Sequence, residues 1–191
     1  MTPPRVSVVL PVRDAVATVE RAARSILDST LRELELIIID DGSADGSADL
    51  VRQISDPRLR LVQQDALGVC AATNRGTAEA TSPVIARMDA DDYSHPARLE
   101  KQLSLLHDSG ADMVGCRVRI VDALGQAVES MQRYEQWSNL LIEPARIAAM
   151  RFVELPIVNP TLLAKREVFE LGYRDGVWPE DYDLCLRALG Q

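Results

Sequence analysis

Short apolar runs alternate with helical periodicity along the first half of the chain. Four runs rich in Val, Ile and Leu predict buried strands at 6–10, 34–39, 58–62 and 84–88, and Pro11 stops the first of them. Apolar residues at helical spacing, together with Gly- or Ser-rich turns, predict helices that follow these strands at 16–27, 48–54, 68–80 and 96–109. Four strand–helix units in succession favour an α/β fold with a mostly parallel sheet flanked by helices.

The pattern is weaker in the second half. Short elements are expected there: strands at 112–116 and 117–121, a turn at 124–126, and helices at 165–171 and 182–189. The polar stretch 132–144 fits either a surface connection or a lid or loop that contacts a substrate. No repeat, low-complexity tract or linker divides the sequence, so residues 1–191 are expected to form one domain.

Composition and charge restrict the partners. With 191 residues, 47% of them hydrophobic, the chain can bury a core without disulfides or a structural metal. The net charge of −8 argues against nucleic acid or an anionic membrane as the main partner. A nucleotide is compatible with this charge if a metal bridges its phosphates to acidic side chains.

Cysteine spacing and hydropathy indicate the compartment. Cys70, Cys116 and Cys185 form no CxxC pair, which argues against a zinc site and favours buried thiols in a reduced compartment. Residues 1–4 lack the features of a signal peptide, and no apolar run approaches the roughly 20 residues that span a bilayer. We expect a cytoplasmic protein without a transmembrane segment, which leaves peripheral contact with the inner face of the membrane open.

Acidic clusters follow two of the predicted strands. Asp89–Asp92 comes directly after the strand at 84–88, and Asp40–Ser43 follows the strand at 34–39. Carboxylates this close raise one another's pKa, so a hard cation or a phosphate-bound metal would keep them ionised; the alternative is a solvated Asp-rich turn. Ligands of parallel sheets bind at the carboxyl ends of the strands, which is where a nucleotide is expected.

Other nucleotide and phosphate chemistries lack their motifs. Neither GxGxxG nor GxxxxGK[ST] occurs, which excludes a dinucleotide fingerprint and a P-loop. Receiver-like phosphoacceptors and aspartyl-phosphate phosphatases need acidic residues after the first strand, where Pro11–Asp14 stands here. A sugar nucleotidyltransferase would need a Gly-rich basic loop at the same place, and none is present.

Four motifs together resemble the inverting family 2 glycosyltransferases. In chain order they are Val6–Asp14, Ile38–Ser47, Met88–Asp92 and Glu180–Leu184. The resemblance covers the chain from Val6 to its end and implies the GT-A fold. In that fold a Rossmann-like nucleotide-sugar-binding half, about 1–95 here, joins an acceptor-binding half, about 96–191, without a linker. It also implies a nucleotide-sugar donor, most often uridine-linked, a glycan or lipid-linked acceptor, and Mg²⁺ or Mn²⁺.

The resemblance assigns the metal-binding residues to the cluster at 89–92. Asp91 is the expected metal ligand, and Asp89 would serve the ribose or a metal-bound water. Asp92 would either join the metal shell or cap the following helix. A cation held here would stabilise the departing diphosphate.

Donor-binding residues are expected in three other segments. Pro11, Val12 and Asp14 would cradle the base and ribose, although Asp14 also fits a helix cap. Asp41 would accept a hydrogen bond from the base, or else satisfy local amides. Asn74 is the remaining expected donor contact.

The acceptor hydroxyl must lose its proton as it attacks the sugar. By resemblance Asp181 takes this proton as the general base, and Glu180 assists in orientation or acceptor binding. Both residues also fit the acidic first turn of a helix, which is compatible with catalysis. Trp178 fits either stacking on a sugar ring or packing.

Departures from the family pattern leave alternatives open. Thr73 stands where many relatives carry Arg, so Arg75 or Arg87 would have to replace that charge, and Asn159 precedes Pro160 where relatives often have His. The Gln-x-x-Arg-Trp motif of processive synthases is absent, which favours transfer of a single sugar. The chain ends ten residues after Asp181, so we expect a truncated acceptor half. A nucleotide-sugar-binding domain without turnover is the alternative function.

Overall fold

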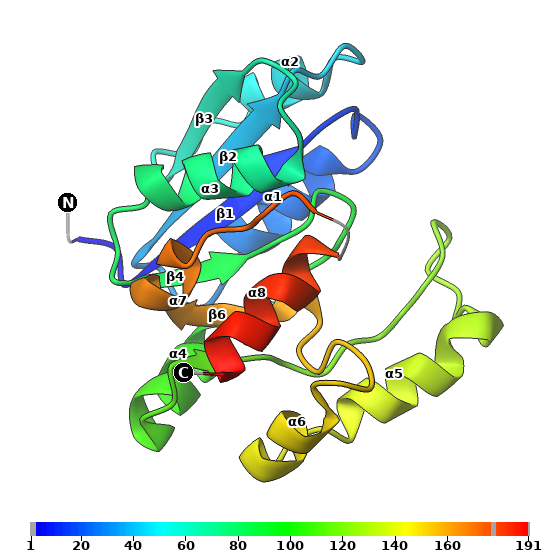
Figure 1. The fold of residues 1–191 in the computed structure, drawn as a ribbon. Helices are drawn as coiled ribbons and strands as arrows, with labels where there is room; N and C mark the ends of the chain where they lie inside the picture. The colour runs from blue at the N-terminus through cyan, green and yellow to red at the C-terminus, as the bar shows by residue number, and fades with distance from the viewer. Residues whose placement is uncertain (1–2, 177–178, 191) are drawn as a thin grey trace.

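A six-stranded sheet organises the computed structural model, which describes residues 3–176 and 179–190 (Figure 1). The strand order is β3-β2-β1-β4-β6-β5. The strands are β1 (Val6–Val12), β2 (Leu34–Asp41), β3 (Leu59–Gln64), β4 (Val84–Arg87), β5 (Met113–Val114) and β6 (Leu163–Lys165). β1 pairs in parallel with β2 and β4, and β2 with β3, whereas β6 runs antiparallel to β4 and β5. The expected mixed and mostly parallel sheet is therefore confirmed.

Helices cover both faces of this sheet. The α-helices are α1 (Val19–Leu27), α2 (Ser47–Arg52), α3 (Val69–Glu79), α4 (Arg98–Ser109), α5 (Gln132–Asn139), α6 (Pro144–Met150), α7 (Arg166–Glu170) and α8 (Glu180–Leu189), with short 3-10 turns η1 (Glu129–Met131) and η2 (Asn159–Thr161). Val8 and Leu10 of β1 pack with α1, α2 and α4, whereas Val9 packs with α3, α7 and α8. This alternation follows from the two-residue period of a strand.

The first strand continues through Pro11, contrary to the expected stop. Pro11 lies opposite Ile39 of β2, and the chain stays extended to Val12. The Val9 carbonyl accepts a hydrogen bond from the Met88 N–H, so the backbone of Val9 faces β4. The backbone of Pro11, two residues later, faces the same side, but β4 has already ended there at Arg87. The missing N–H of Pro11 therefore leaves no neighbouring strand unpaired.

The second half differs more from the sequence expectation. Residues 117–121 form no strand and contribute only an isolated bridge between Val121 and Ala127. The stretch 132–144 is mainly the helix α5, and β6 was not predicted because three residues are too short to establish a period. Cys70 and Cys185 are buried as expected, but Cys116 is exposed.

A glycine in α3 allows that helix to approach the sheet closely. A Cβ atom on Gly76 would lie 2.3 Å from Cγ1 of Val9. Only hydrogen fits at this contact, so the gain in helix propensity that Ala would give is outweighed by overpacking. Gly76 thus fixes α3 directly against β1.

Helices α5 and α6 extend away from the sheet (Figure 1). Neither contains a buried residue. No helix among the described residues is both long and apolar enough to cross a membrane.

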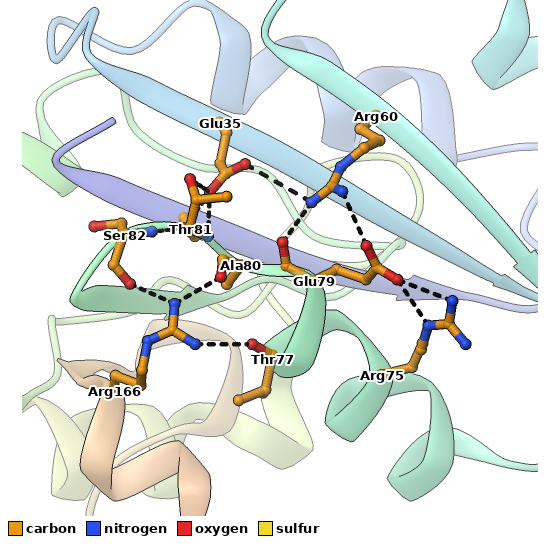
Figure 2. Close-up of polar contacts among 10 residues, drawn as sticks. Glu35, Arg60, Arg75, Thr77, Glu79, Ala80, Thr81, Ser82 and Arg166 are labelled. Atoms are coloured by element: carbon orange, nitrogen blue, oxygen red, sulfur yellow. Dashed lines mark hydrogen bonds and ion pairs between the residues drawn. The ribbon is translucent and has the colours of Figure 1, made fainter. Parts of the chain in front are cut away.

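A polar network ties the elements together at the edge where β2 and β4 begin (Figure 2). The carboxylate of Glu35 accepts hydrogen bonds from the hydroxyls of Ser7 and Thr81 and from the Thr81 N–H. Burial acts to raise the pKa of Glu35, but these hydrogen bonds and the Arg60 charge together lower it. Arg166 donates to the carbonyls of residues 77, 80 and 82 and so satisfies the last turn of α3.

Replacing Glu35 by Gln is expected to lower the free energy of unfolding by about 1.5–3 kcal/mol at pH 7, because hydrogen bonds to a charged acceptor are lost. The pKa of Glu35 is lowered in the folded state, so its contribution is complete above the ordinary value of 4.5 and is lost as the pH falls through the lower folded value. Urea denaturation at pH 7 and at a series of pH values below 4.5 would measure this difference. Glu170→Gln, at an exposed position of α7, is the matched control, and equal losses in both variants would contradict the prediction.

Candidate functional site

A cavity of about 550 Å³ opens at the carboxyl ends of the parallel strands. Its lining comes from the end of β1 and the loop after it, from β2, from the start of α3 and from the segment after β4. Of the residues predicted to bind donor or metal, the cavity is lined by Pro11, Val12, Asp14, Asp41, Asp89 and Asp91. The parallel pairing of β1 with both neighbours brings these segments together.

Two loops that form the cavity wall are locked to each other. Asp14 has a left-handed backbone with φ 49°, its N–H donates to Ser43 Oγ at 3.0 Å, and its Oδ1 accepts from the Ala44 N–H at 2.8 Å. The next two N–H groups donate to Ser47 Oγ and to Asp45 Oδ2. Asp14 therefore does not cap α1, which begins after Thr18. The hydrogen bonds of Asp45 and Ser47 to the loop after β1 were not predicted, although both residues belong to the motif 38–47.

Asp41 is buried at the end of β2 and holds the start of α3. Its carboxylate accepts hydrogen bonds from Gln64 Nε2 at 2.7 Å and from the N–H groups of Leu67 and Gly68, both at 2.9 Å. Burial alone would raise its pKa, but these three hydrogen bonds, with Arg13 nearby, lower it and keep the carboxylate ionised. The local-amide alternative therefore describes Asp41 in this structure, and a carboxylate has lone pairs left for a ligand.

The acidic segment after β4 is only partly neutralised. Arg87, with 2% of its surface exposed, pairs with Asp89 at 2.7 Å between Nη1 and Oδ1. Burial raises the pKa of Asp89, and the Arg87 charge opposes this rise. Burial, together with the carboxylates of Asp89 and Asp91, raises the pKa of Asp92 to about 6. Asp92 does not cap α4, whose N-terminus has no side-chain cap.

This segment fits a divalent cation that shares its ligands with a phosphate. Within residues 3–176 and 179–190, no three His, Cys, Asp or Glu side chains are arranged to hold a metal by themselves. Asp91 is exposed and lines the cavity, next to carboxyls whose mutual repulsion a cation would relieve. Mg²⁺ is usually held by one or two carboxylates and substrate phosphates, which is what this arrangement offers.

Two buried side chains of α4 hold the acidic segment against the second half of the chain. Arg98 donates to the carbonyls of Arg87 and Pro160, each at 2.8 Å, and Gln102 donates to the Thr161 carbonyl at 2.8 Å. Sequence reasoning missed this link because both residues belong to a helix whose apolar stripe alone was interpreted. Their burial, with 8% of Arg98 and 3% of Gln102 exposed, is a property of the folded chain that the helical spacing alone does not show.

Glu180 and Asp181 lie in the first turn of α8, in agreement with the expectation that they fit the acidic first turn of a helix. Burial raises the pKa of Asp181, a hydrogen bond from the Tyr182 N–H opposes this, and the Glu180 charge adds to the rise. A carboxylate with a raised pKa is better able to accept a proton. The prediction for Trp178 lies outside the described residues.

Three consecutive residues of α3, Thr73 to Arg75, differ in their exposure and contacts. The Asn74 side chain does not line the cavity but forms two hydrogen bonds with the backbone of Tyr173. Thr73 is buried, and its hydroxyl donates a hydrogen bond to the Val69 carbonyl in the same helix. Arg75 is exposed and pairs with Glu79, so of the two arginines that could replace the missing family charge, Arg87 is the one that lines the cavity.

Comparison with known proteins identifies relatives of one kind. A model of the family "Glycosyl transferase family 2" matches residues 7–172. The O-antigen biosynthesis glycosyltransferase WbnJ of Escherichia coli is 29% identical over 97% of this chain and 72% of its own length. The succinoglycan biosynthesis protein ExoU of Rhizobium meliloti is 30% identical over 98% of this chain, which spans only 57% of ExoU.

Solved structures share the fold at lower identity. Residues 1–349 of Staphylococcus aureus TarS, in complex with UDP, have a TM-score of 0.75 at 16% identity, over 97% of this chain and 55% of that solved chain. The mannosyltransferase PcManGT of Pyrobaculum calidifontis, in complex with GDP-Man and Mn²⁺, has a TM-score of 0.75 at 22% identity, over 98% of this chain and 52% of that protein. The sheet and its flanking helices therefore form the GT-A fold, and the chain belongs to glycosyl transferase family 2.

Proposed function

We propose that this chain transfers a single sugar from a nucleotide-sugar donor to a glycan or lipid-linked acceptor, with inversion at the anomeric carbon. The observation that carries the proposal is the cavity at the carboxyl ends of the parallel strands, lined on one side by Asp41 and on another by Asp89 and Asp91. Solved structures that share the fold include complexes with UDP, UDP-GlcNAc and GDP-Man, which supports a nucleotide sugar as ligand. The relatives named for O-antigen and succinoglycan biosynthesis support a glycan acceptor.

On the donor side, each end of the cavity would bind a different part of the nucleotide. The base and ribose would lie against Pro11 and Val12, with a free lone pair of the Asp41 carboxylate accepting from the base, as the uracil N3–H allows. Because the loop after β1 is already latched to residues 43–47, donor binding would order little additional backbone. Uridine is the nucleoside we propose.

Asp91, next to Asp89 and Asp92, would hold Mg²⁺ or Mn²⁺ together with oxygens of the diphosphate. The cation would supply Lewis-acid stabilisation of the charge that develops on the leaving group. Arg87 would keep Asp89 ionised and add a positive charge to the same wall of the cavity. The relative solved with Mn²⁺ supports a divalent metal.

On the acceptor side, Asp181 would take the proton of the attacking hydroxyl. Its raised pKa suits a group that must be ionised near neutral pH yet accept a proton in the transition state. Glu180 would orient the acceptor. The boundary near residue 95 between a donor half and an acceptor half is part of this proposal.

Removing the Asp91 carboxylate is expected to weaken UDP binding at least tenfold, because the cation would lose its ligand from the chain. Calorimetric titration of UDP with Mn²⁺ into the wild type and Asp91→Asn, and into the wild type with EDTA, measures this loss. Asp108→Asn, an exposed site on α4, is the control and should bind as the wild type does. Equal UDP affinity with Mn²⁺ and with EDTA would rule out the metal-dependent site.

Replacing Asp181 by Asn is expected to lower kcat about 10²- to 10⁴-fold with UDP affinity unchanged, because only proton transfer is lost. Since burial raises the pKa of Asp181, the wild-type kcat should fall on acidification at a pH above the ordinary Asp value of 3.8. Assays of UDP release from UDP-sugars as a function of pH measure both effects.

Glu180→Gln is the control for the proton acceptor. A loss of kcat in Glu180→Gln but not in Asp181→Asn would assign the role of proton acceptor to Glu180. Donor binding by the wild type without any transfer or hydrolysis would instead favour a nucleotide-sugar-binding domain without turnover.

A further inference from the structure

Asn74 in the middle of α3 makes a paired contact with a distant segment. Its Nδ2 donates to the carbonyl of Tyr173, and its Oδ1 accepts from the N–H of the same residue, both at 2.8 Å. Two short hydrogen bonds from one planar group fix both the position and the orientation of the backbone at residue 173.

The segment that Asn74 contacts is held from two further sides. We call Leu171–Tyr173 the clamp segment. Arg187 of α8 donates to its first two carbonyls, at residues 171 and 172, and the Tyr173 hydroxyl donates to Oδ1 of Asn159 at 3.1 Å. Tyr173 has only 4% of its surface exposed, so its own side chain is largely removed from water.

The clamp segment joins the helix of the cavity to the helix of the proposed base. Helix α3 begins at Val69, which lines the cavity, and Asn74 ties its middle to the clamp segment. Helix α8 begins at Glu180 and is tied to the same segment by Arg187. Burial raises the pKa of the Tyr173 phenol; the Arg87 charge opposes the rise, and the charges of Asp89 and Asp181 reinforce it.

We propose that Asn74 is a positioning residue, which through the clamp segment sets the first turn of α8, and with it Asp181, relative to the donor cavity. This inference rests on the proposed role of Asp181. It replaces the expectation that Asn74 binds the donor, because its side chain does not line the donor cavity and both of its polar atoms bond to Tyr173. Removing Asn74 should therefore displace the base and leave donor binding intact.

Hydrogen exchange tests the mechanical part of the proposal without any ligand. In Asn74→Ala, backbone amides of residues 171–176 and of the first turn of α8 are expected to exchange at least tenfold faster. Amides of β1 and β2 should stay within twofold of the wild type. The control is Arg75→Ala, because Arg75 is the next residue of α3, half-exposed and paired only with Glu79 among the described residues. Exchange at 171–176 that equals the wild type would overturn the clamp.

Kinetics test the functional part. Asn74→Ala is expected to lower kcat for UDP release from UDP-sugars at least tenfold, while UDP affinity in Mn²⁺ stays within about twofold. Arg75→Ala should change neither quantity. A loss of UDP affinity in Asn74→Ala would overturn the inference in favour of direct donor contact, and an unchanged kcat would overturn it as well.

A second variant covers the case in which Asn74→Ala fails to fold. Asn74→Asp keeps the shape and one acceptor oxygen but loses the donor to the Tyr173 carbonyl, so the same split between kcat and affinity is expected. If the wild type itself neither binds UDP nor releases it, the proposed function fails, whereas the exchange result still decides whether Asn74 holds the clamp segment.

Discussion

The parallel pairing of β1 with β2 on one side and β4 on the other is the constraint on which the site depends. The register sets Val12 beside Asp40 and Val9 beside Arg87, so three strands end at one edge of the sheet. Parallel strands require crossover helices on the faces, and the buried apolar side chains of both faces stabilise this arrangement. The loops that follow these strands therefore converge on one cavity, whatever their own sequences prefer.

Buried polar contacts perform a second task, which is to join the two halves of the chain. Arg98 connects the end of β4 with the Pro160 turn, and Asn74 connects α3 with Tyr173. Each of these side chains binds backbone carbonyls or amides, whose positions are fixed by the fold. A buried polar group is costly when unpaired, so such contacts favour one relative placement of the halves over its alternatives.

Charge at the site is balanced incompletely. Arg87 compensates Asp89, whereas the carboxyls that follow keep a raised pKa at Asp92. Asp41, by contrast, is satisfied by local amides and has a lowered pKa. The two acidic motifs thus resemble each other in sequence but differ in their electrostatics: repulsion among neighbouring carboxyls helps to raise the pKa of Asp92, whereas hydrogen bonds stabilise the ionised form of Asp41.

The sequence by itself determined the four strand–helix units, the edge at which the acidic motifs lie and the family, because apolar periodicity and short motifs are local signals. The tertiary structure alone decided the antiparallel β6, the helix in place of the loop at 132–144, the latching by Asp45 and Ser47, and the partner of Asn74. Those features depend on contacts between residues far apart in the chain. No local pattern encodes them, since the same side chains would serve equally well as caps, turns or ligands until their neighbours are fixed.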